Sequence, residues 1–492
     1  MKKLIYIPNG LNSPELEILL SLSQTALDNN EDLTILTCSG FGKYSCPKNL
    51  YSSSIVCALC KSQTNKGLKN LKGNFKVEFT PKIKVRNFYK NFERVKLINF
   101  MYKKSDLGLG VFASYTNQLR DRDLNGYFSN NLVNNLLNTS IHLYNFFEKY
   151  LNLKRFDEII VFNGRMSNVR PIFSAAKFLK NKVKFKLIEF KGYKNRIYNF
   201  NHHLPGEINS LYKLVKPYLK KKLNKNELKT VKKHFSDRLN GKLSLDPKSY
   251  VNKQQKNLLP EKWVPELKNI VYFTSSTDEY ESFGKENLIK LFKDQTEAIS
   301  YIAKYLSKFR NINFWIRLHP NMKNINWKYV KKQRNLHNKY FNVRVISPES
   351  KVSSYAILKN CDLVIGTSDT STILEAAYWG KPSIVIGKSL WEKIDISVRP
   401  KNLQSLKKLL VNKKPKIFSK MIAQNYIYFW TFGGFKNKYF SGNIASKFYF
   451  KKKNIKFNFF ENIVYKIYKL YEKLVLNFLI NFCMRKFKNN GT

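Results

Sequence analysis

Acidic residues are scarce in this chain. Its 492 residues include 34 Asp and Glu against 88 Lys and Arg, which gives a formal net charge of +54. Glycine and proline are also few, at 20 and 15, whereas 43% of the residues are hydrophobic. This composition excludes a collagen-like, low-complexity or largely disordered protein. A chain of this length is expected to form two domains of roughly 200 residues each.

The excess of positive charge is spread along the whole sequence, and much of it is Lys interleaved with Asn and Ile. A clustered basic face would favour nucleic-acid binding, because bound cations release counterions from phosphates. The sequence has no aromatic RNP run, no Cys2His2 spacing and no basic region followed by heptads. We interpret the charge as a lysine-rich composition with some attraction to anionic lipid or sugar nucleotides, and expect no specific nucleic-acid partner.

Long hydrophobic runs are missing. A membrane-spanning helix needs about 18 uninterrupted apolar residues, and the best candidate, at 474–484, is shorter. The first ten residues, MKKLIYIPNG, contain an apolar run only at 4–7, and a secretory signal needs a longer one. The sequence therefore predicts a first β-strand and a cytosolic start.

Cysteine is infrequent as well, but four of the six cysteines lie close together with the spacing C-x7-C-x10-C-x2-C. In a cytosolic chain such a group is a metal site or a set of plain thiols rather than disulfides. Four thiolates can hold a tetrahedral zinc, although the first two gaps are irregular for a zinc ribbon. A structural zinc and unliganded thiols both stay open for Cys38, Cys46, Cys57 and Cys60.

Strand-like and helical stretches alternate in both halves of the chain, and no short internal repeat appears. The opening has a β-α-β pattern at 3–7, 15–27 and 33–37. We predict an α/β fold of two doubly wound, Rossmann-like domains facing across a cleft. The strands expected in the second half lie at 270–273, 313–318, 343–346, 361–365 and 383–386.

The predicted boundaries are an N-terminal domain at 1–209, a helical linker at 210–264, a second domain at 265–440 and a tail at 441–492. The linker is dense in Lys and has little strand signal. The tail has eleven Lys and Arg between 447 and 488, with apolar residues at helical spacing. This basic amphipathic helix suits an anionic membrane interface. The alternative is a closing helix packed on the N-terminal domain, and both can hold along different turns.

Polar residues that follow parallel strands are candidates for ligand binding, because α/β sheets bind ligands at that edge. Arg317 and His319 close one strand and could bind a phosphate, with His319 also able to donate a proton. The Ser/Thr cluster at 367–372 precedes a helix and is either an anion site or a simple N-cap formed by Ser371 or Thr372. Glu375 could bind a ribose diol or be a surface Glu favoured by the helix dipole. The donor-binding candidates are Arg317, Ser275, Ser276, Ser368, Ser371, Thr372 and Glu375.

Three motifs carry a family resemblance. R-L-H-P-N at 317–321, S-S-Y-x-x-L-x-x-C-D-L-V-I at 353–365 and S-D-T-S-T-x-x-E-A-x-x-x-G-K-P at 368–382 resemble the donor half of GT-B glycosyltransferases. The nearest resemblance is to bacterial capsule and surface-polysaccharide enzymes, including Kdo transferases and sialyltransferases, which use CMP-activated sugars. It covers about 269–386 well and the N-terminal half loosely, through F-N-G-R at 162–165.

The resemblance implies roles for individual residues. It implies that His319 contacts the donor phosphate together with Ser371 and Thr372, with Ser368 as a neighbour. It implies an acceptor-side role for Asn163 and Arg165. Charge neutralisation by Arg317, His319 and a helix N-terminus means that we expect no metal or cofactor to be required for catalysis.

The sequence also departs from the family pattern. Around Glu375 there is no E-x7-E pair of retaining enzymes, which favours an inverting reaction. The N-terminal half lacks the acidic-acidic-Gly motif of sialyltransferases, so the general base is not identified. An inverting transfer needs a carboxylate near the acceptor hydroxyl. Asp278, Glu279 and Glu189 are the candidates, and each could equally be a surface acid.

The sequence thus predicts a cytoplasmic glycosyltransferase, peripheral at the inner face of the membrane. It would move a sugar from a nucleotide-sugar donor, with CMP-linked sugars among the candidates, to a surface-polysaccharide or lipid-linked acceptor. The alternatives in the same fold are a polyol-phosphate transferase and a nucleotide-sugar epimerase. A non-catalytic glycan- or nucleotide-sugar-binding component of a capsule complex is a further alternative, and nucleic-acid binding rests on charge alone.

Overall fold

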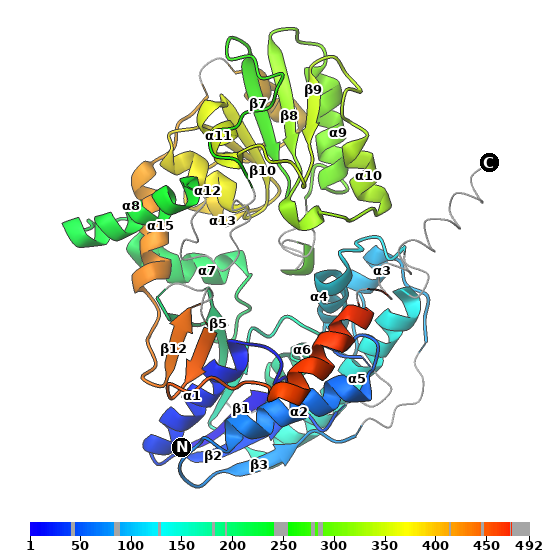
Figure 1. Cartoon of the computed structure of the whole chain (residues 1–492), viewed down its shortest axis with the longest axis vertical. Coiled ribbons are helices and arrows are strands. Elements are labelled where there is room, and N and C mark those ends of the chain that lie inside the picture. Colours follow the sequence, from blue (N-terminus) through cyan, green and yellow to red (C-terminus); the bar gives the residue numbers. More distant parts are fainter. Residues whose placement is uncertain are drawn as a thin grey trace. The chain divides into compact units, whose positions relative to one another are not determined.

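The computed structural model describes residues 1–40, 45–82, 89–125, 129–179, 183–191, 194–240, 254–276, 281–283, 289–412, 415–443, 447–472 and 474 (Figure 1). The chain forms two compact α/β units. Each contains a mostly parallel sheet with helices, so the α/β class and the two Rossmann-like domains predicted from the sequence are confirmed. Unit 1 comprises Met1–Phe190, Ile197–Pro205 and Phe435–Thr492, and unit 2 comprises Lys191–Arg196 and Gly206–Gly434.

Unit 1 is built on a six-stranded sheet with the strand order β3-β2-β1-β4-β5-β6. All neighbouring strands are parallel except β6, which runs antiparallel to β5. The central strand β1 is apolar and buried along almost its whole length, as expected of a parallel strand covered on both faces. The strands are β1 (Lys2–Ile7), β2 (Asp32–Thr37), β3 (Lys76–Phe79), β4 (Glu158–Phe162), β5 (Lys184–Phe190) and β6 (Ile197–Asn199).

The helices of unit 1 supply the other side of its core. In α1 the apolar residues Leu16, Leu19 and Leu20 are buried against Ile5 and Ile35 of the sheet. This burial of one helix face holds the first β-α-β unit together. The helices are α1 (Glu15–Asp28), α2 (Ser54–Leu68), α3 (Arg94–Ile98), α4 (Leu107–Leu119), α5 (Ser129–Lys154) and α6 (Arg170–Ala176).

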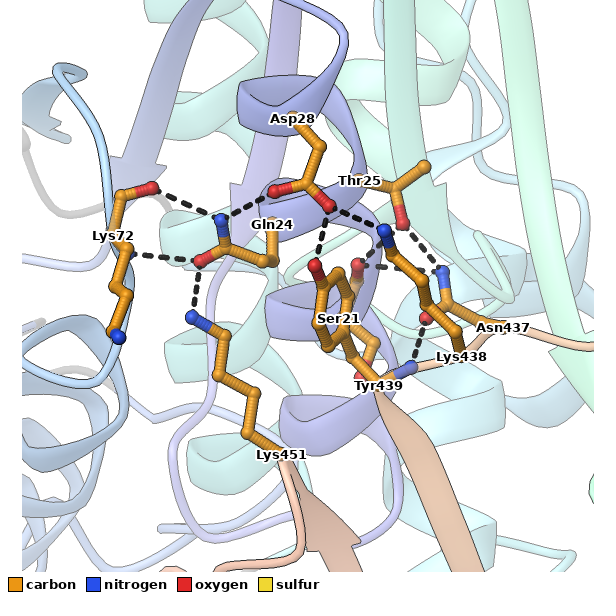
Figure 2. Close-up of polar contacts among 9 residues, drawn as sticks. All are labelled: Ser21, Gln24, Thr25, Asp28, Lys72, Asn437, Lys438, Tyr439 and Lys451. Atoms are coloured by element: carbon orange, nitrogen blue, oxygen red, sulfur yellow. Dashed lines mark hydrogen bonds and ion pairs between the residues drawn. The ribbon is translucent and has the colours of Figure 1, made fainter.

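The chain returns to unit 1 near its end, where β12 (Phe440–Asn443) and β13 (Lys447–Phe450) form an antiparallel hairpin beside α1. Phe448 and Phe450 are buried in the core of unit 1. Residues 437–439, which lead into β12, contact the polar side of α1, as Figure 2 shows. Asn437 donates to the Thr25 hydroxyl (2.9 Å), and the Asp28 carboxylate accepts from Lys438 (2.9 Å) and from the Tyr439 hydroxyl.

Unit 2 contains a five-stranded sheet of order β11-β10-β7-β8-β9 in which all neighbouring strands are parallel. Its strands are β7 (Lys268–Phe273), β8 (Ile312–Arg317), β9 (Val343–Ile346), β10 (Leu363–Thr367) and β11 (Ser383–Ile386). Its helices are α7 (Ile208–Val215), α8 (Lys225–Leu239), α9 (Gln295–Leu306), α10 (Lys328–Arg334), α11 (Ser354–Asn360), α12 (Ser371–Tyr378), α13 (Leu390–Lys393), α14 (Leu403–Val411) and α15 (Lys420–Phe432).

The segment expected to be a linker at 210–264 contains α7 and α8, and both belong to unit 2. The reason is burial: Val231 and Phe235 of α8 are inside the fold, and the Phe235 ring stacks on Tyr378 with the ring centroids 3.6 Å apart. This apolar face is hard to recognise in the sequence, because the outward-facing residues of α7 and α8 are rich in Lys. The segment at 441–492 also differs from the separate helical tail that the sequence predicted, because its β12–β13 hairpin packs into unit 1.

A helix at 459–472 closes unit 1 (red in Figure 1). Glu461 forms an ion pair with Lys66 of α2 and accepts a hydrogen bond from Ser62. Tyr468 on the same face is 8% exposed. Helix 459–472 therefore has the contacts of a closing helix on this face, and in the part of the chain that the structure describes no helix has the length and apolarity needed to span a bilayer.

Candidate functional site

The first candidate site lies at the carboxyl edge of the unit 2 sheet. Strands β10, β7 and β8 are neighbours there, and Phe273 at the end of β7 is paired with Gly366 on one side and Arg317 on the other. As expected from the sequence, the strand carrying Arg317 and the strand leading to Ser371 therefore belong to one parallel sheet. Loops that follow such strands meet at one edge.

Hydrogen bonds tie these loops together. The backbone N–H of His319 donates to the Thr274 hydroxyl (2.8 Å), and the Ser275 hydroxyl donates to the carbonyl of Thr367 (3.0 Å). The Ser276 hydroxyl is fully buried and contacts the Met322 sulfur at 3.9 Å. The structure thus brings the three loops together and holds both serine hydroxyls inside the edge.

The His319 ring is held in a defined orientation. The ring is half-buried, and its Nδ1 accepts the backbone N–H of Asn321 at 3.1 Å. A neutral imidazole that accepts at Nδ1 carries its proton on Nε2. His319 therefore presents Nε2–H as its hydrogen-bond donor.

Arg317 lies deeper, with 2% of its surface exposed. Its Nη1 donates to the carbonyl of Ser347, and its Nε lies 3.4 Å from the Ser354 hydroxyl. Burial lowers the pKa of the guanidinium to about 10, so it stays charged at neutral pH. The structure shows this charge engaged by the β9–α11 loop and α11, and a direct phosphate contact stays a prediction.

The N-terminus of α12 is the third part of this edge. Its N-cap residue is Thr370, and no side-chain cap hydrogen bond is formed there among the described residues. The alternative that Ser371 or Thr372 acts as the N-cap is therefore wrong, because both are already inside the helix. The first amides of a helix are electropositive, and side chains, water or anions can accept from them.

The loop before α12 is also held by residues at the start of α13. Ser368 has a φ of +50°, a backbone conformation that non-glycine residues rarely adopt. The Asp369 carboxylate accepts from the Ser389 hydroxyl (2.6 Å) and from the N–H of Leu390 (2.7 Å). Trp391 donates from its ring to the carbonyl of Thr370 (2.9 Å). The start of α12 is therefore preorganised by unit 2 itself.

Glu375 lies on α12 but is buried, with 3% of its surface exposed. Its carboxylate pairs with Nε of Arg238 on α8 at 2.7 Å and accepts from the Tyr355 hydroxyl. These contacts hold Glu375 within unit 2, and the ribose contact expected from the sequence stays a prediction.

The second candidate site lies at the carboxyl edge of the unit 1 sheet. Asn163 follows β4 with a φ of +61°, and its side-chain amide donates to Glu189 at the end of β5 (2.6 Å). The other Glu189 oxygen accepts the N–H of Phe190 (2.9 Å), and the N–H of Arg165 donates to the Asn163 side chain (3.1 Å). The three residues that the sequence analysis selected in the N-terminal half, Asn163, Arg165 and Glu189, thus form one cluster.

Glu15 lies near this cluster and was not among the residues expected from the sequence. It is in the first turn of α1, is 7% exposed, and accepts a hydrogen bond from Asn12 at 2.5 Å. Burial raises the pKa of its carboxyl from 4.5 to about 7, and the charge of Glu189 adds to the shift. In the sequence Glu15 resembles any Glu at a helix start, and the one available signal was its place just after the first strand.

The four clustered cysteines line one cavity of about 270 Å³ beside the ends of β1 and β2. Burial raises the pKa of the Cys38, Cys46 and Cys60 thiols, to about 12 for Cys38, so these three are protonated at neutral pH. No three His, Cys, Asp or Glu side chains of the described residues are arranged to hold a metal ion. The cysteines surround a space, two from loops and two from α2, and a zinc at this position stays a prediction. The other two candidate bases, Asp278 and Glu279, lie outside the described residues.

No protein-family model and no curated protein matches this chain. Among solved structures it is similar to Thermosulfurimonas dismutans KpsC, a β-Kdo 2,4-transferase, at 12% identity and a TM-score of 0.36, covering 66% of this chain and 88% of that one. It is also similar to S. aureus MnaA solved with UDP, at 13% identity, a TM-score of 0.29 and coverages of 88% and 94%. For the Methanocaldococcus jannaschii UDP-GlcNAc 2-epimerase, solved with UDP-GlcNAc and UDP, the values are 13%, 0.27, 88% and 100%. Likeness this distant does not extend to activity.

Proposed function

We propose that the chain is a glycosyltransferase that uses a nucleotide-sugar donor, with CMP-linked sugars among the candidates. One observation carries this proposal: the loops after β10, β7 and β8 meet at one sheet edge, where they combine His319 with the uncapped start of α12. Hydrogen-bond donors gathered at one sheet edge suit a phosphate group.

The chemistry follows from where charge develops. When the bond between the sugar and the nucleotide phosphate breaks, the departing phosphate gains negative charge. Nε2–H of His319 and the first amides of α12 would stabilise that charge, and the buried Arg317 adds a fixed positive charge nearby. Interactions that strengthen in the transition state accelerate the reaction. We propose an inverting transfer that these groups support without a metal or cofactor.

The experiment starts with nucleotide binding. Thermal-shift assays with CMP, UDP, GDP and CDP identify the nucleotide that the chain prefers. A ligand at about 100 times its dissociation constant stabilises the folded state by about 2.7 kcal/mol. Nucleotide release is then measured with sugars linked to the preferred nucleotide. His319→Ala should lower turnover on the order of a hundredfold. His337→Ala is the control, since His337 also accepts a backbone N–H at Nδ1 but is exposed on another turn.

The products separate the alternatives. A transferase joins the sugar to an acceptor, an epimerase returns a changed nucleotide sugar, and a polyol-phosphate transferase leaves the phosphate on the product. Binding without turnover indicates a non-catalytic component of a capsule complex. Full activity of His319→Ala would contradict the proposal.

We also propose that unit 1 attaches peripherally to the cytoplasmic face of a membrane through helix 459–472. The face of this helix opposite Glu461 and Tyr468 is apolar and exposed: Phe460 is 73%, Ile467 63% and Leu470 60% exposed. At 100° per residue these three side chains lie in an arc about 80° wide. Exposed Lys466 and Lys469 complement anionic headgroups. An exposed apolar stripe of this kind needs a partner.

Vesicle sedimentation tests the attachment. The full chain should bind phosphatidylglycerol vesicles more tightly than phosphatidylcholine vesicles, and salt should weaken the binding. Replacing Ile467 and Leu470 together by Asp should reduce binding on the order of tenfold or more. Phe341→Asp, at an exposed apolar residue of unit 2, is the matched control. Unchanged vesicle binding by the double variant would contradict the attachment.

A further inference from the structure

A second cavity of unit 1 lies at the start of α1. It is distinct from the cysteine-lined cavity, although Leu11 lines both. Its volume is about 570 Å³, and all its lining residues belong to unit 1. Residues 10–17 and Gln63 contribute part of the lining, and residues 447–465 contribute the rest. We call this space the hairpin cavity, because the β12–β13 hairpin and the segment after it supply these later residues. Its size is that of cavities that hold small-molecule ligands.

The C-terminal part of the lining is held in place by α1 and α2. Lys451, in the turn after β13, donates to the side chain of Gln24 on α1 (2.6 Å), as Figure 2 shows. The polar atoms of the Gln63 amide on α2 lie 3.1 Å from the carbonyl of Ile455 and from the N–H of Phe457. With the amide oxygen towards Phe457, both contacts are hydrogen bonds. The cavity is therefore preorganised, which lowers the cost of binding a ligand.

The buried part of the lining is polar. Glu17 is 3% exposed, and the Ser13 hydroxyl donates to one of its carboxyl oxygens (2.9 Å). The other oxygen has no hydrogen-bond partner among the described residues. A buried oxygen without a partner costs free energy, and a ligand hydroxyl is a donor that can satisfy it. The amides of Asn454 and Asn462 also line the cavity, and Asn454 is oriented by donating to the carbonyl of Phe448 (2.8 Å).

Aromatic rings supply much of the apolar lining. Phe457 and Tyr465 are half-buried, and their ring centroids are 5.1 Å apart. A sugar ring has apolar C–H faces and hydroxyl groups at its edge, so aromatic rings beside amides and a carboxyl suit a carbohydrate. At 100° per residue, Asn462 and Tyr465 lie on a side of helix 459–472 away from its exposed apolar stripe. The cavity and that stripe therefore use different faces of the helix.

The exposed part of the lining is positively charged. Lys447 and Lys456 are exposed, whereas Glu17, the one acidic lining residue among those that the structure describes, is buried. Ammonium groups form strong, charge-assisted hydrogen bonds with carboxylates. A ligand that suits the whole lining therefore combines hydroxyl groups for the buried part with acid groups for the exposed part.

We propose that the hairpin cavity binds a short acidic oligosaccharide. Its hydroxyl groups bond to Glu17, Asn454 and Asn462. One sugar face packs on Phe457 or Tyr465, and the acid groups pair with the exposed lysines of the lining. This site goes beyond the proposed function and does not rest on it, because binding requires unit 1 alone and no nucleotide.

Isothermal titration calorimetry with the full chain tests the site. Trigalacturonate is the acidic oligosaccharide, and maltotriose is the neutral one of the same length. Trigalacturonate should bind on the order of tenfold more tightly than maltotriose, and salt should reduce this difference. Tri-glutamate carries the same net charge without sugar rings, so it reports attraction by the positive charge of the chain. It should also bind on the order of tenfold more weakly than trigalacturonate.

Two substitutions locate the binding. Lys456→Glu reverses one charge of the lining and should weaken trigalacturonate binding on the order of tenfold or more. Asn462→Ala removes one amide and should weaken it about fivefold. The matched controls are Lys452→Glu and Asn152→Ala, at exposed residues of unit 1 outside the lining, and both should bind as the wild type does. In the wild type, trigalacturonate should also slow hydrogen exchange in the segment 454–465.

Each result decides the proposal. Preferred binding of trigalacturonate that is weakened in the two lining variants and kept in the two controls supports it. The proposal is overturned if trigalacturonate does not bind at millimolar concentration, or if maltotriose or tri-glutamate binds equally tightly. It is also overturned if the lining variants bind as the controls do, because the oligosaccharide then binds elsewhere. None of these measurements involves nucleotide release, so the proposed function stands or fails separately.

Discussion

Replacing Glu15 by Gln should stabilise unit 1 at alkaline pH. The folded carboxyl has a pKa of about 7, whereas its reference value is 4.5. The folded state therefore binds more protons than the unfolded state between these values, and the free energy of unfolding falls as pH rises through this window. Glutamine removes the titration and keeps a side chain that can accept from Asn12.

The magnitude follows from the two pKa values. Their difference corresponds to about 3 kcal/mol at 1.36 kcal/mol per unit. No reduction for solvent screening applies, because Glu15 is 7% exposed. Between about pH 4 and about pH 8.5 the advantage of Glu15→Gln over the wild type should grow by about 3 kcal/mol. Such a gain is a large share of a domain's stability.

Thiol labelling in urea can report each unit separately. Cys38 and Cys46 line the unit 1 cavity, and Cys361 is buried in unit 2. A dipyridyl disulfide reacts with thiols in acid as well as at neutral pH, so exposure of each cysteine gives the unfolding of its own unit at both pH values. The shift should appear at Cys38 and Cys46 and leave Cys361 unchanged.

The control is Glu93→Gln, an exposed carboxylate of unit 1 with 78% of its side chain accessible, which should change stability equally at both pH values. The reasoning is refuted if Glu15→Gln has the same effect at both pH values, or if it destabilises unit 1 more at alkaline pH than in acid.

Three further predictions concern packing. Glu375→Ala should lower the stability of unit 2 by about 3 kcal/mol because it removes a buried carboxylate that pairs with Arg238. Urea unfolding followed by tryptophan fluorescence measures this, since all six tryptophans lie in unit 2. Asp28 has a pKa lowered to about 2 by hydrogen bonds from Tyr439, Gln24 and Lys438. Asp28→Asn should therefore speed hydrogen exchange in β12–β13, and in the wild type the same loosening should appear as pH falls below about 4. Gly10→Ala should destabilise unit 1 by about 1–3 kcal/mol, because the added Cβ would collide with the α2 backbone. Thiol labelling of Cys60 should become faster, and an unchanged labelling rate would contradict the prediction.

Much of the α/β pattern could be predicted from local signals. The strands at β1, β7, β8 and β10 are short apolar runs followed by polar residues, and each is found close to its predicted place. The sheet edge with Thr274, His319 and Ser371 follows from the same pattern, because parallel strands end on one side. Helix α8 escaped prediction as part of unit 2, since few of its residues are apolar and their burial depends on Tyr378 and α15.

The sequence by itself determined most strands of the two main sheets and which polar residues follow them, because hydrophobic periodicity and turn residues are local properties. Only the tertiary structure decided that the β12–β13 hairpin returns to α1 and that Glu375 pairs with Arg238. It also decided that Glu15 is desolvated beside Glu189. Pairing and desolvation depend on residues distant in the chain, and the free energy of a charge is set by whatever the fold places around it.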